Sequence, residues 1–216
     1  MLRGCRPIEI KTYNRINIRF YSYIWCVKPK DDEKKAAIHQ ETLNLVYEKG
    51  IAGIKMAELA RKVGISPSTL YVYHKNKEEL ILDLFTEILQ DHTVAFRKQL
   101  AGDLPFMLKL KKVWLEMLHM SINNVKEMNF IRQVKQSPYF DKVPARVKED
   151  KIKMSQELLD MGKQQLLIKD LPNNILESVA EANIMQTLTM VLNKQLTLSE
   201  KDMDMMFSFL WDAIKR

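Results

Sequence analysis

The chain has 216 residues, 46% of them apolar and 28% charged, a balance that is typical of globular proteins and excludes a fibrous or disordered chain. Its formal net charge of +7 suggests a nucleic-acid partner. However, residues 1–30 hold seven Lys or Arg and a single acid, so the remainder is close to neutral. No apolar run reaches the ~20 residues that a membrane helix needs, and two cysteines make no disulfide framework. We therefore expect a cytoplasmic protein without a membrane partner.

Residues 1–30 form a basic N-terminal extension that mixes β-forming residues with scattered arginines and matches nothing later in the chain. Three interpretations remain open for it: a flexible arm, a short structured extension, or translated sequence upstream of the true start. We favour a flexible arm, which could reach into a DNA minor groove.

From residue 31 onward, apolar residues recur at spacings of three and four, and only 6 Gly and 7 Pro occur in the whole chain. This period predicts an all-α fold of about nine helices. Gly50 is expected to end the first helix, and Asn76 with Glu79 predicts a capping box at the start of the fourth. The helices are expected at 32–49, 56–63, 67–74, from residue 76 to about 100, and at 104–125, 128–136, 144–167, 172–194 and 199–215. We assign residues 31–80 to a DNA-binding domain and residues 81–216 to a helical ligand-binding and dimerisation domain.

Residues 56–73 have the pattern of a helix-turn-helix, in which two short helices are joined by a tight turn. Gly64 suits the turn, because one residue there often takes a positive φ. Ala60 is the small residue that allows the two helices to approach closely. The inward positions are apolar: Leu59, Val63, Ile65, Leu70 and Tyr73. These features together favour DNA binding over a helical hairpin that binds nothing.

The helix that follows Ser66 is expected to enter the major groove. Its first residues carry hydroxyl groups for phosphates or base edges, its later Tyr and His side chains can hydrogen-bond phosphate oxygens, and Pro67 and Val72 can touch thymine methyl groups. Lysines on either side would clamp the DNA backbone. The predicted DNA-binding residues are Lys55, Ser66, Pro67, Ser68, Thr69, Tyr71, Val72, Tyr73, His74 and Lys77. No Arg, Asn or Gln lies between Ser66 and His74, so specificity is expected to rest on hydroxyls, methyl contacts and DNA shape.

Residues 48–80 also carry a wider set of spaced residues: Gly50, Met56, Leu59, Ala60, Val63, Gly64, Ser66, Thr69, Leu70, Tyr71, Tyr73, Lys77, Glu78 and Leu80. With this set the chain resembles the DNA-binding domain of the TetR/AcrR family of bacterial regulators. The resemblance implies a homodimer that binds a near-palindromic operator in double-stranded DNA, usually as a repressor, and that responds to a small-molecule effector. Two positions depart from the family pattern. Lys55 stands where a capping Thr or Ser is usual, and His74 stands where Phe is common.

The last two predicted helices are apolar around more of their circumference than a single surface helix buries. One face could pack in the chain's own core and the other against a two-fold partner, so we expect a homodimer. The predicted interface residues are Ile184, Leu188, Phe207, Leu210 and Trp211.

The middle helices are rich in Met and large apolar residues, which suit an adaptable effector pocket. The predicted pocket residues are Phe106, Leu110, Trp114, Met117, Met120 and Phe130. Glu116 and His119 lie among them and could tune charge selectivity, although exposed polar residues are the simpler interpretation.

An enzyme is not expected, because the chain has no Gly-rich phosphate loop and no nucleophile elbow. Its four histidines are scattered along the chain at positions 39, 74, 92 and 119, with no pair spaced for a metal site. We therefore predict no metal and no cofactor. The main alternative is a helical adaptor or ligand-binding protein without DNA binding, and a further one is that the basic extension dominates binding.

Overall fold

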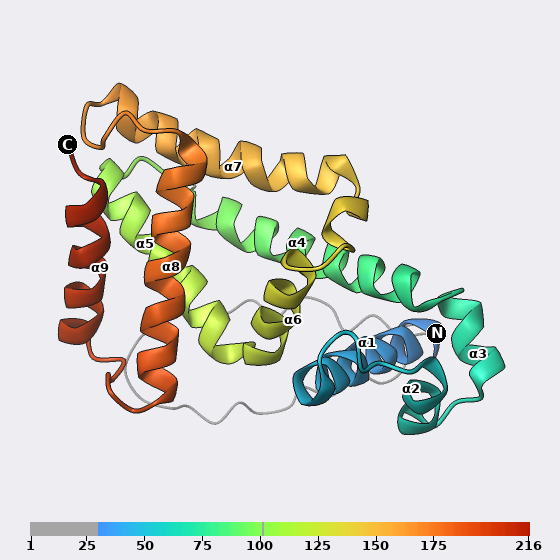
Figure 1. The fold of residues 1–216 in the computed structure, drawn as a ribbon. Helices are drawn as coiled ribbons and strands as arrows, with labels where there is room; N and C mark the ends of the chain where they lie inside the picture. Colours follow the sequence, from blue (N-terminus) through green and yellow to red (C-terminus); the bar gives the residue numbers. More distant parts are fainter. Residues whose placement is uncertain (1–29, 101) are drawn as a thin grey trace, which may run out of the picture.

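The computed structural model describes residues 30–100 and 102–216, in which the regular structure is helical apart from one isolated bridge between Ile168 and Lys215 (Figure 1). The predicted basic extension, apart from its last residue, lies outside these residues. In the described part of the chain, no helix is both long enough and apolar enough to cross a membrane.

The expected number and order of helices are confirmed within the described residues. They are α1 (Lys30–Lys49), α2 (Met56–Val63), α3 (Pro67–Tyr73), α4 (Lys77–Leu100), α5 (Phe106–Asn123), α6 (Val125–Lys135), α7 (Ala145–Gln164), α8 (Asn173–Leu192) and α9 (Glu200–Ile214). A short 3-10 helix, η1 (Phe140–Lys142), precedes α7 and was not expected from the sequence.

Several helix ends follow from local side-chain chemistry. Gly50 ends α1 with a φ of 72°, a left-handed conformation that a residue without Cβ adopts at little cost. At the start of α4, Asn76 Oδ1 accepts a hydrogen bond from the backbone N–H of Glu79 at 2.8 Å. The Glu79 carboxylate in turn accepts from the N–H of Lys75 at 2.8 Å, so the predicted capping box is present with Lys75 as its second donor.

Two apolar cores lie at opposite ends of α4. The first joins α1, α2, α3, the first half of α4 and part of α6, and it includes Phe85 and Phe130. The second joins α5, α7, α8 and α9 around Trp114 and Phe207. Because α4 has 24 residues, it is about 36 Å long and runs from the first core to the second (Figure 1).

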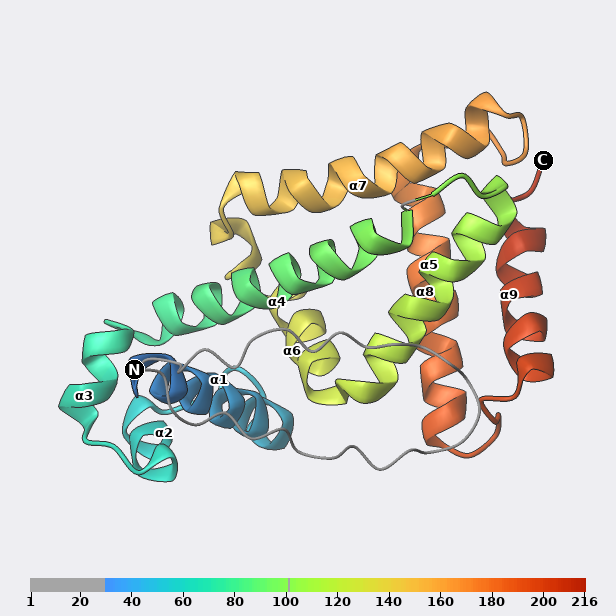
Figure 2. The ribbon, with the colours of Figure 1, turned by 180° about the vertical axis from the view of Figure 1, so that it is seen from behind.

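The helices α8 and α9 lie side by side at the end of the molecule away from α2 and α3, as both views show (Figure 1 and Figure 2). A second link between the two cores runs through α6, where the side-chain oxygen of Gln133 accepts a hydrogen bond from the N–H of Ile51 at 2.9 Å. The part of the chain formed by α1, α2 and α3 is therefore attached to the remaining helices through α4 and, by way of α1 and the loop after it, through α6.

Candidate nucleic-acid interface

The turn between α2 and α3 has the geometry expected of a helix-turn-helix. Gly64 takes a φ of 77°, and its N–H donates to the carbonyl of Arg61 at 3.2 Å. Leu59, Ala60 and Leu70 are fully buried beneath the two helices. The predicted turn and inward positions are therefore confirmed.

Ser66 caps α3, as predicted, by accepting a hydrogen bond from the backbone N–H of Thr69 at 3.1 Å. Its Oγ also lies 2.8 Å from the hydroxyl oxygens of both Ser68 and Thr69. Three predicted DNA-binding hydroxyls thus form one cluster at the start of α3. Because Ser66 already serves the cap, Ser68 and Thr69 are the better placed of the three to contact DNA.

The outer face of α3 is exposed and uncharged. Ser68 and Pro67 are exposed at its start, and Tyr71 and Val72 follow with exposed fractions of 48% and 83%. Among the described residues, a Val side chain left this exposed has little to pack on, while Leu70 on the opposite face is fully buried. The recognition helix therefore presents an apolar and hydroxyl-bearing surface to solvent.

Two predicted DNA-binding residues at the end of α3 are engaged elsewhere. The Tyr73 hydroxyl donates a hydrogen bond to Asp31 of α1 at 2.9 Å, and desolvation together with this bond raises the pKa of Tyr73. His74 is only 2% exposed, so the expectation that it reaches a phosphate is wrong for this conformation. The reason is that α3 ends at Tyr73, and the extended backbone of His74 turns its ring inward against His39.

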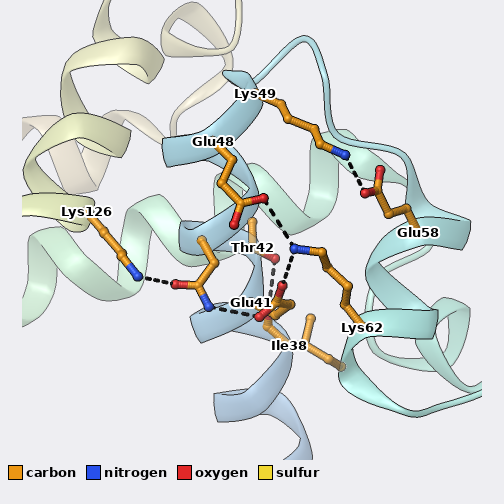
Figure 3. Close-up of polar contacts among 9 residues, drawn as sticks. Ile38, Glu41, Thr42, Glu48, Lys49, Glu58, Lys62 and Lys126 are labelled. Carbon is orange, nitrogen blue, oxygen red and sulfur yellow. Dashed lines mark hydrogen bonds and ion pairs between the residues drawn. The ribbon is translucent and has the colours of Figure 1, made fainter.

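Two lysines near the helix-turn-helix hold α2 against α1 (Figure 3). Lys62 lies 3.1 Å from Glu41 and 3.3 Å from Glu48 of α1, and these acids raise the pKa of Lys62. Lys49 pairs with Glu58 and lowers the pKa of that carboxyl. Acidic residues of α1 and α2 thus form ion pairs with two of the lysines near the helix-turn-helix.

The two predicted clamp lysines differ in their surroundings. Lys55 is exposed at the start of α2, where it provides no side-chain cap, as its residue type predicts. The Lys77 ammonium donates to the carbonyl of Ala52 at 3.0 Å, and burial lowers its pKa. Lys77 therefore joins α4 to the loop after α1, whereas Lys55 faces solvent.

A separate apolar cavity of about 370 Å³ lies between α4, α5, α6, α7 and α8, a size that suits a small-molecule ligand. Methionine is frequent in its wall. Apolar residues that line it include Phe96, Leu110, Met117, Met120, Met154 and Met185. A few polar side chains also reach it, among them His92, Glu116, Arg132 and Glu177. The wall is thus mainly hydrocarbon and thioether, with charged groups of both signs.

Two family models match the chain. The model for bacterial regulatory proteins of the tetR family matches residues 38–84, which contain the helix-turn-helix, and the model for the tetracyclin repressor-like C-terminal domain matches residues 105–215. The chain belongs to the TetR family. The predicted resemblance, the all-α fold and the assignment as a helix-turn-helix transcriptional regulator are confirmed at the level of the TetR family.

Individual TetR-family proteins are similar over different parts of the chain. An HTH-type transcriptional regulator of Haemophilus influenzae strain Rd is 22% identical over 111 residues, which are 51% of this chain and 59% of that protein. The chain thus matches less than two thirds of this relative's length.

The solved structure of a TetR-family regulator from Marinobacter aquaeolei VT8 has a TM-score of 0.75 at 22% identity and covers 86% of this chain and 97% of that chain. The transcriptional regulator FadR from Bacillus subtilis, solved in complex with stearoyl-CoA, has a TM-score of 0.66 at 18% identity, over 82% of this chain and 95% of that chain. At these identities the structural likeness establishes the TetR fold alone.

Three of the predicted pocket residues of this TetR-family chain line the cavity and three do not. Leu110, Met117 and Met120 are in its wall. The three large aromatic residues do not line the cavity, because each packs in one of the two cores. Their rings lie against other aromatic rings, with centroids 5.8–6.4 Å apart. The pairs are Phe106 with Trp211, Trp114 with Phe207, and Phe130 with Phe85. Of the two polar candidates, Glu116 reaches the cavity and His119 is exposed outside it.

Sequence reasoning confined the pocket to the middle helices and missed the walls from α4, α7 and α8. Phe96, Met154 and Met185 lie far apart in the sequence and meet only because three helices converge. The frequency of Met was the one usable signal, since 13 occur in the chain.

The predicted dimer residues also need correction. Ile184, Leu188, Phe207 and Leu210 are buried in the chain's own second core, and Trp211 is half-buried against it. Each of the two helices packs its most apolar side into the second core, so the apolar residues that remain exposed lie at other positions of α8 and α9. The exposed, uncharged residues include Ile175, Ser178, Ala182, Gln186, Thr189 and Leu192 of α8 and Met205, Ser208 and Phe209 of α9.

Proposed function

We propose that this TetR-family chain binds a near-palindromic operator as a homodimeric repressor and releases it when an apolar effector occupies the cavity. The observation that carries the DNA-binding part is the outer face of α3. Ser68, Tyr71 and Val72 face solvent together on a helix whose opposite side is held by Leu70. Such a face is open to solvent in the part of the chain that the structure describes, and a helix in the second position of a helix-turn-helix fits the major groove.

The chemistry of this face supports base reading by hydroxyl and methyl contacts. Val72 can touch a thymine methyl, and the hydroxyls of Ser68 and Thr69 can serve base edges or phosphates. Lys55 and Arg61, both exposed on or before α2, are placed to neutralise phosphates. Operator specificity then comes from modest contacts in each half-site, repeated at a spacing of about 34–36 Å by the dimer.

The experiment is selection of bound sequences from random double-stranded DNA by the full chain, followed by affinity measurement on the enriched sequence. Tyr71→Ala should weaken binding at least tenfold, because it removes a phosphate contact and part of the recognition surface. Tyr47→Ala is the matched control, since Tyr47 of α1 is equally exposed at 52% but lies outside α3. A protein that enriches no sequence would instead support the helical adaptor or ligand-binding alternative.

A homodimer is supported by the outward faces of α8 and α9. None of the exposed residues of α8 from Ile175 to Leu192 is charged, and Phe209 of the neighbouring helix α9 is 59% exposed. An uncharged row on α8, next to a helix that exposes Met205 and Phe209, suits a two-fold interface, in which the same patch of each copy meets the other. This dimer would place its two copies of α3 at the far ends of α4 (Figure 2).

The cavity supports an effector with a largely apolar body. Its wall of Met, Leu and Phe side chains offers dispersion contacts that adapt to ligand shape, and FadR from Bacillus subtilis binds stearoyl-CoA in the same fold. The cavity touches both α4 and α6, the two helices that carry the helix-turn-helix. A ligand that shifts either helix would change the distance between the two copies of α3 in the dimer. We propose that the protein acts in the cytoplasm.

Stearoyl-CoA is the first probe for this effector site. Met117→Trp should fill part of the cavity and abolish ligand-dependent release of DNA while leaving DNA affinity without ligand unchanged. Met107→Trp on the same helix is the control, because Met107 is exposed and outside the cavity lining. If both variants release DNA as the parent protein does, the cavity is not the effector site.

A further inference from the structure

Two histidines and a carboxylate that are distant in sequence meet where α1, the end of α3 and α4 come together. His39 is 5% exposed and His74 is 2% exposed, with ring centroids 5.5 Å apart. Asp83 Oδ2 lies 3.5 Å from His39 Nε2 and 3.9 Å from His74 Nδ1. One ligand atom from each of the three residues lies within 4.8 Å of the other two. Two of the four histidines that are scattered along the sequence are therefore neighbours in three dimensions.

The ring nitrogens of this cluster are buried without hydrogen-bond partners. Within the described residues, neither nitrogen of His39 and neither nitrogen of His74 makes a hydrogen bond. Buried polar atoms are normally paired, since an unpaired one costs on the order of the desolvation of that group. The nearest charged atoms to these nitrogens are carboxylate oxygens at 3.4–3.9 Å, which is longer than an ordinary hydrogen bond. Ring lone pairs beside carboxylate oxygens form a place that a cation can occupy.

The chemistry of these side chains suits a metal ion. A neutral imidazole offers a metal ion the lone pair of one ring nitrogen. Two imidazoles and one carboxylate form a donor set that Zn²⁺ and its neighbours in the first transition row prefer. Zinc bonds of about 2.0–2.1 Å place tetrahedral ligand atoms ~3.3 Å apart. The ligand atoms lie 3.5 Å and 3.9 Å from Asp83 and within 4.8 Å of one another, so they must draw together when an ion binds. Asp83 is half-exposed and leaves a side open to solvent.

Glu87 and Lys35 complete the surroundings. Glu87 Oε2 lies 3.4 Å from His39 Nδ1, while Nε2 of the same ring faces Asp83. If Glu87 accepts the Nδ1 proton when a metal ion binds, the Nε2 lone pair is left for the metal and the ring is oriented. The Lys35 ammonium lies 2.9 Å from Asp83 and 3.3 Å from Glu87 on a half-exposed, flexible side chain. It is the cation that a metal ion would compete with for these carboxylates.

We propose that His39, His74 and Asp83 bind a divalent transition-metal ion such as Zn²⁺, with Glu87 orienting His39. His74 directly follows the last residue of α3, and the other two ligands lie within α1 and α4. The ion therefore ties the end of the recognition helix to the two helices that pack against it. This site is separate from the apolar cavity and does not depend on which effector fills that cavity.

The test is titration of the full chain with Co²⁺, followed through the visible d–d absorption of the metal and through displacement by Zn²⁺. Cys5→Ser and Cys26→Ser are included in every sample, so that no thiolate binds the probe. We expect one tetrahedral site per chain. Zn²⁺ at about 100 times its dissociation constant should raise the Tm by about 5 °C or more.

Four variants locate the site. His74→Phe and Asp83→Asn should each weaken Co²⁺ binding by at least about tenfold, whereas His119→Gln, which changes an exposed histidine, should bind as the parent does. Lys35→Met should strengthen binding, because it removes the competing ammonium. Far-ultraviolet circular dichroism checks the fold of each, and Asp83→Asn decides if His74→Phe does not fold. Absence of a cobalt band in the parent, or equal affinities in the Asp83→Asn and His119→Gln variants, overturns the proposal.

Discussion

The side-chain oxygen of Asn183 on α8 accepts a hydrogen bond from the indole N–H of Trp114 on α5, with 2.7 Å between the two atoms. The amide nitrogen of Asn183 donates to the carbonyl of Met206 on α9 at 3.0 Å. One half-buried side chain thereby joins three helices of the second core. Trp114 is only 2% exposed, so its N–H has no access to water as a substitute partner.

Replacement of Asn183 by Ala should therefore destabilise the protein by about 2–3 kcal/mol, since it leaves a buried indole N–H and a carbonyl without partners. Asn174→Ala, an exposed position on the same helix that lies before the proposed interface row, should change stability by no more than about 0.5 kcal/mol. Urea denaturation at one fixed protein concentration measures both, because dimerisation makes stability depend on concentration. Equal midpoints for the two variants would show that the three-helix link contributes nothing.

Phe209→Glu should convert the proposed dimer to a monomer. The change places a charge from each copy in the uncharged interface, and burial of an unpaired carboxylate should raise the dimer dissociation constant by about 100-fold or more. Val94→Glu is the control, because Val94 is 70% exposed on α4, away from α8 and α9. Sedimentation velocity at low micromolar concentration distinguishes the two. A parent protein that sediments as a 25.4 kDa species would rule out the dimer.

Lys55→Ala should weaken DNA binding to all sequences alike and should lower the salt dependence of affinity. Each phosphate contact that is lost reduces the slope of log K against log salt by about one, so the change should be about one per bound chain. Lys98→Ala, an exposed position in the last turn of α4, should leave the slope unchanged. The measurement is fluorescence anisotropy with operator and unrelated DNA over a range of salt concentrations.

The Asp202 carboxylate should titrate below its ordinary pKa of 3.8. It accepts hydrogen bonds from the hydroxyl and the backbone N–H of Thr197, which are the largest causes of the lowered pKa, and Ser199 and Lys201 act in the same direction. Because the folded-state pKa is the lower one, the stabilisation is fully present above about pH 3.8 and is lost as pH falls through the folded value. Carboxyl-detected NMR titration should show a higher Asp202 pKa in Thr197→Val than in the parent. An unchanged pKa would mean that the threonine does not hold the carboxylate.

The sequence by itself determined the helices and the helix-turn-helix. These depend on interactions within a few residues: the caps by Ser66 and Asn76, the left-handed turn at Gly64, and the apolar period that buries Leu59 and Leu70. The residues of the turn were also specific enough to indicate the TetR family. Helix caps and tight turns can be predicted from a sequence because the groups that interact in them are neighbours along the chain.

Tertiary structure alone decided which apolar residues are core, cavity or surface. Trp114 and Met117 lie on the same helix, yet one is packed against Phe207 and the other lines a cavity, because the two positions face different helices. His39 and His74 are 35 positions apart and share a buried site only because α3 ends at Tyr73 and the chain turns inward. Helical period reports how apolar a face is, but the partner of that face depends on how helices distant in sequence pack, and that is settled by the fold as a whole.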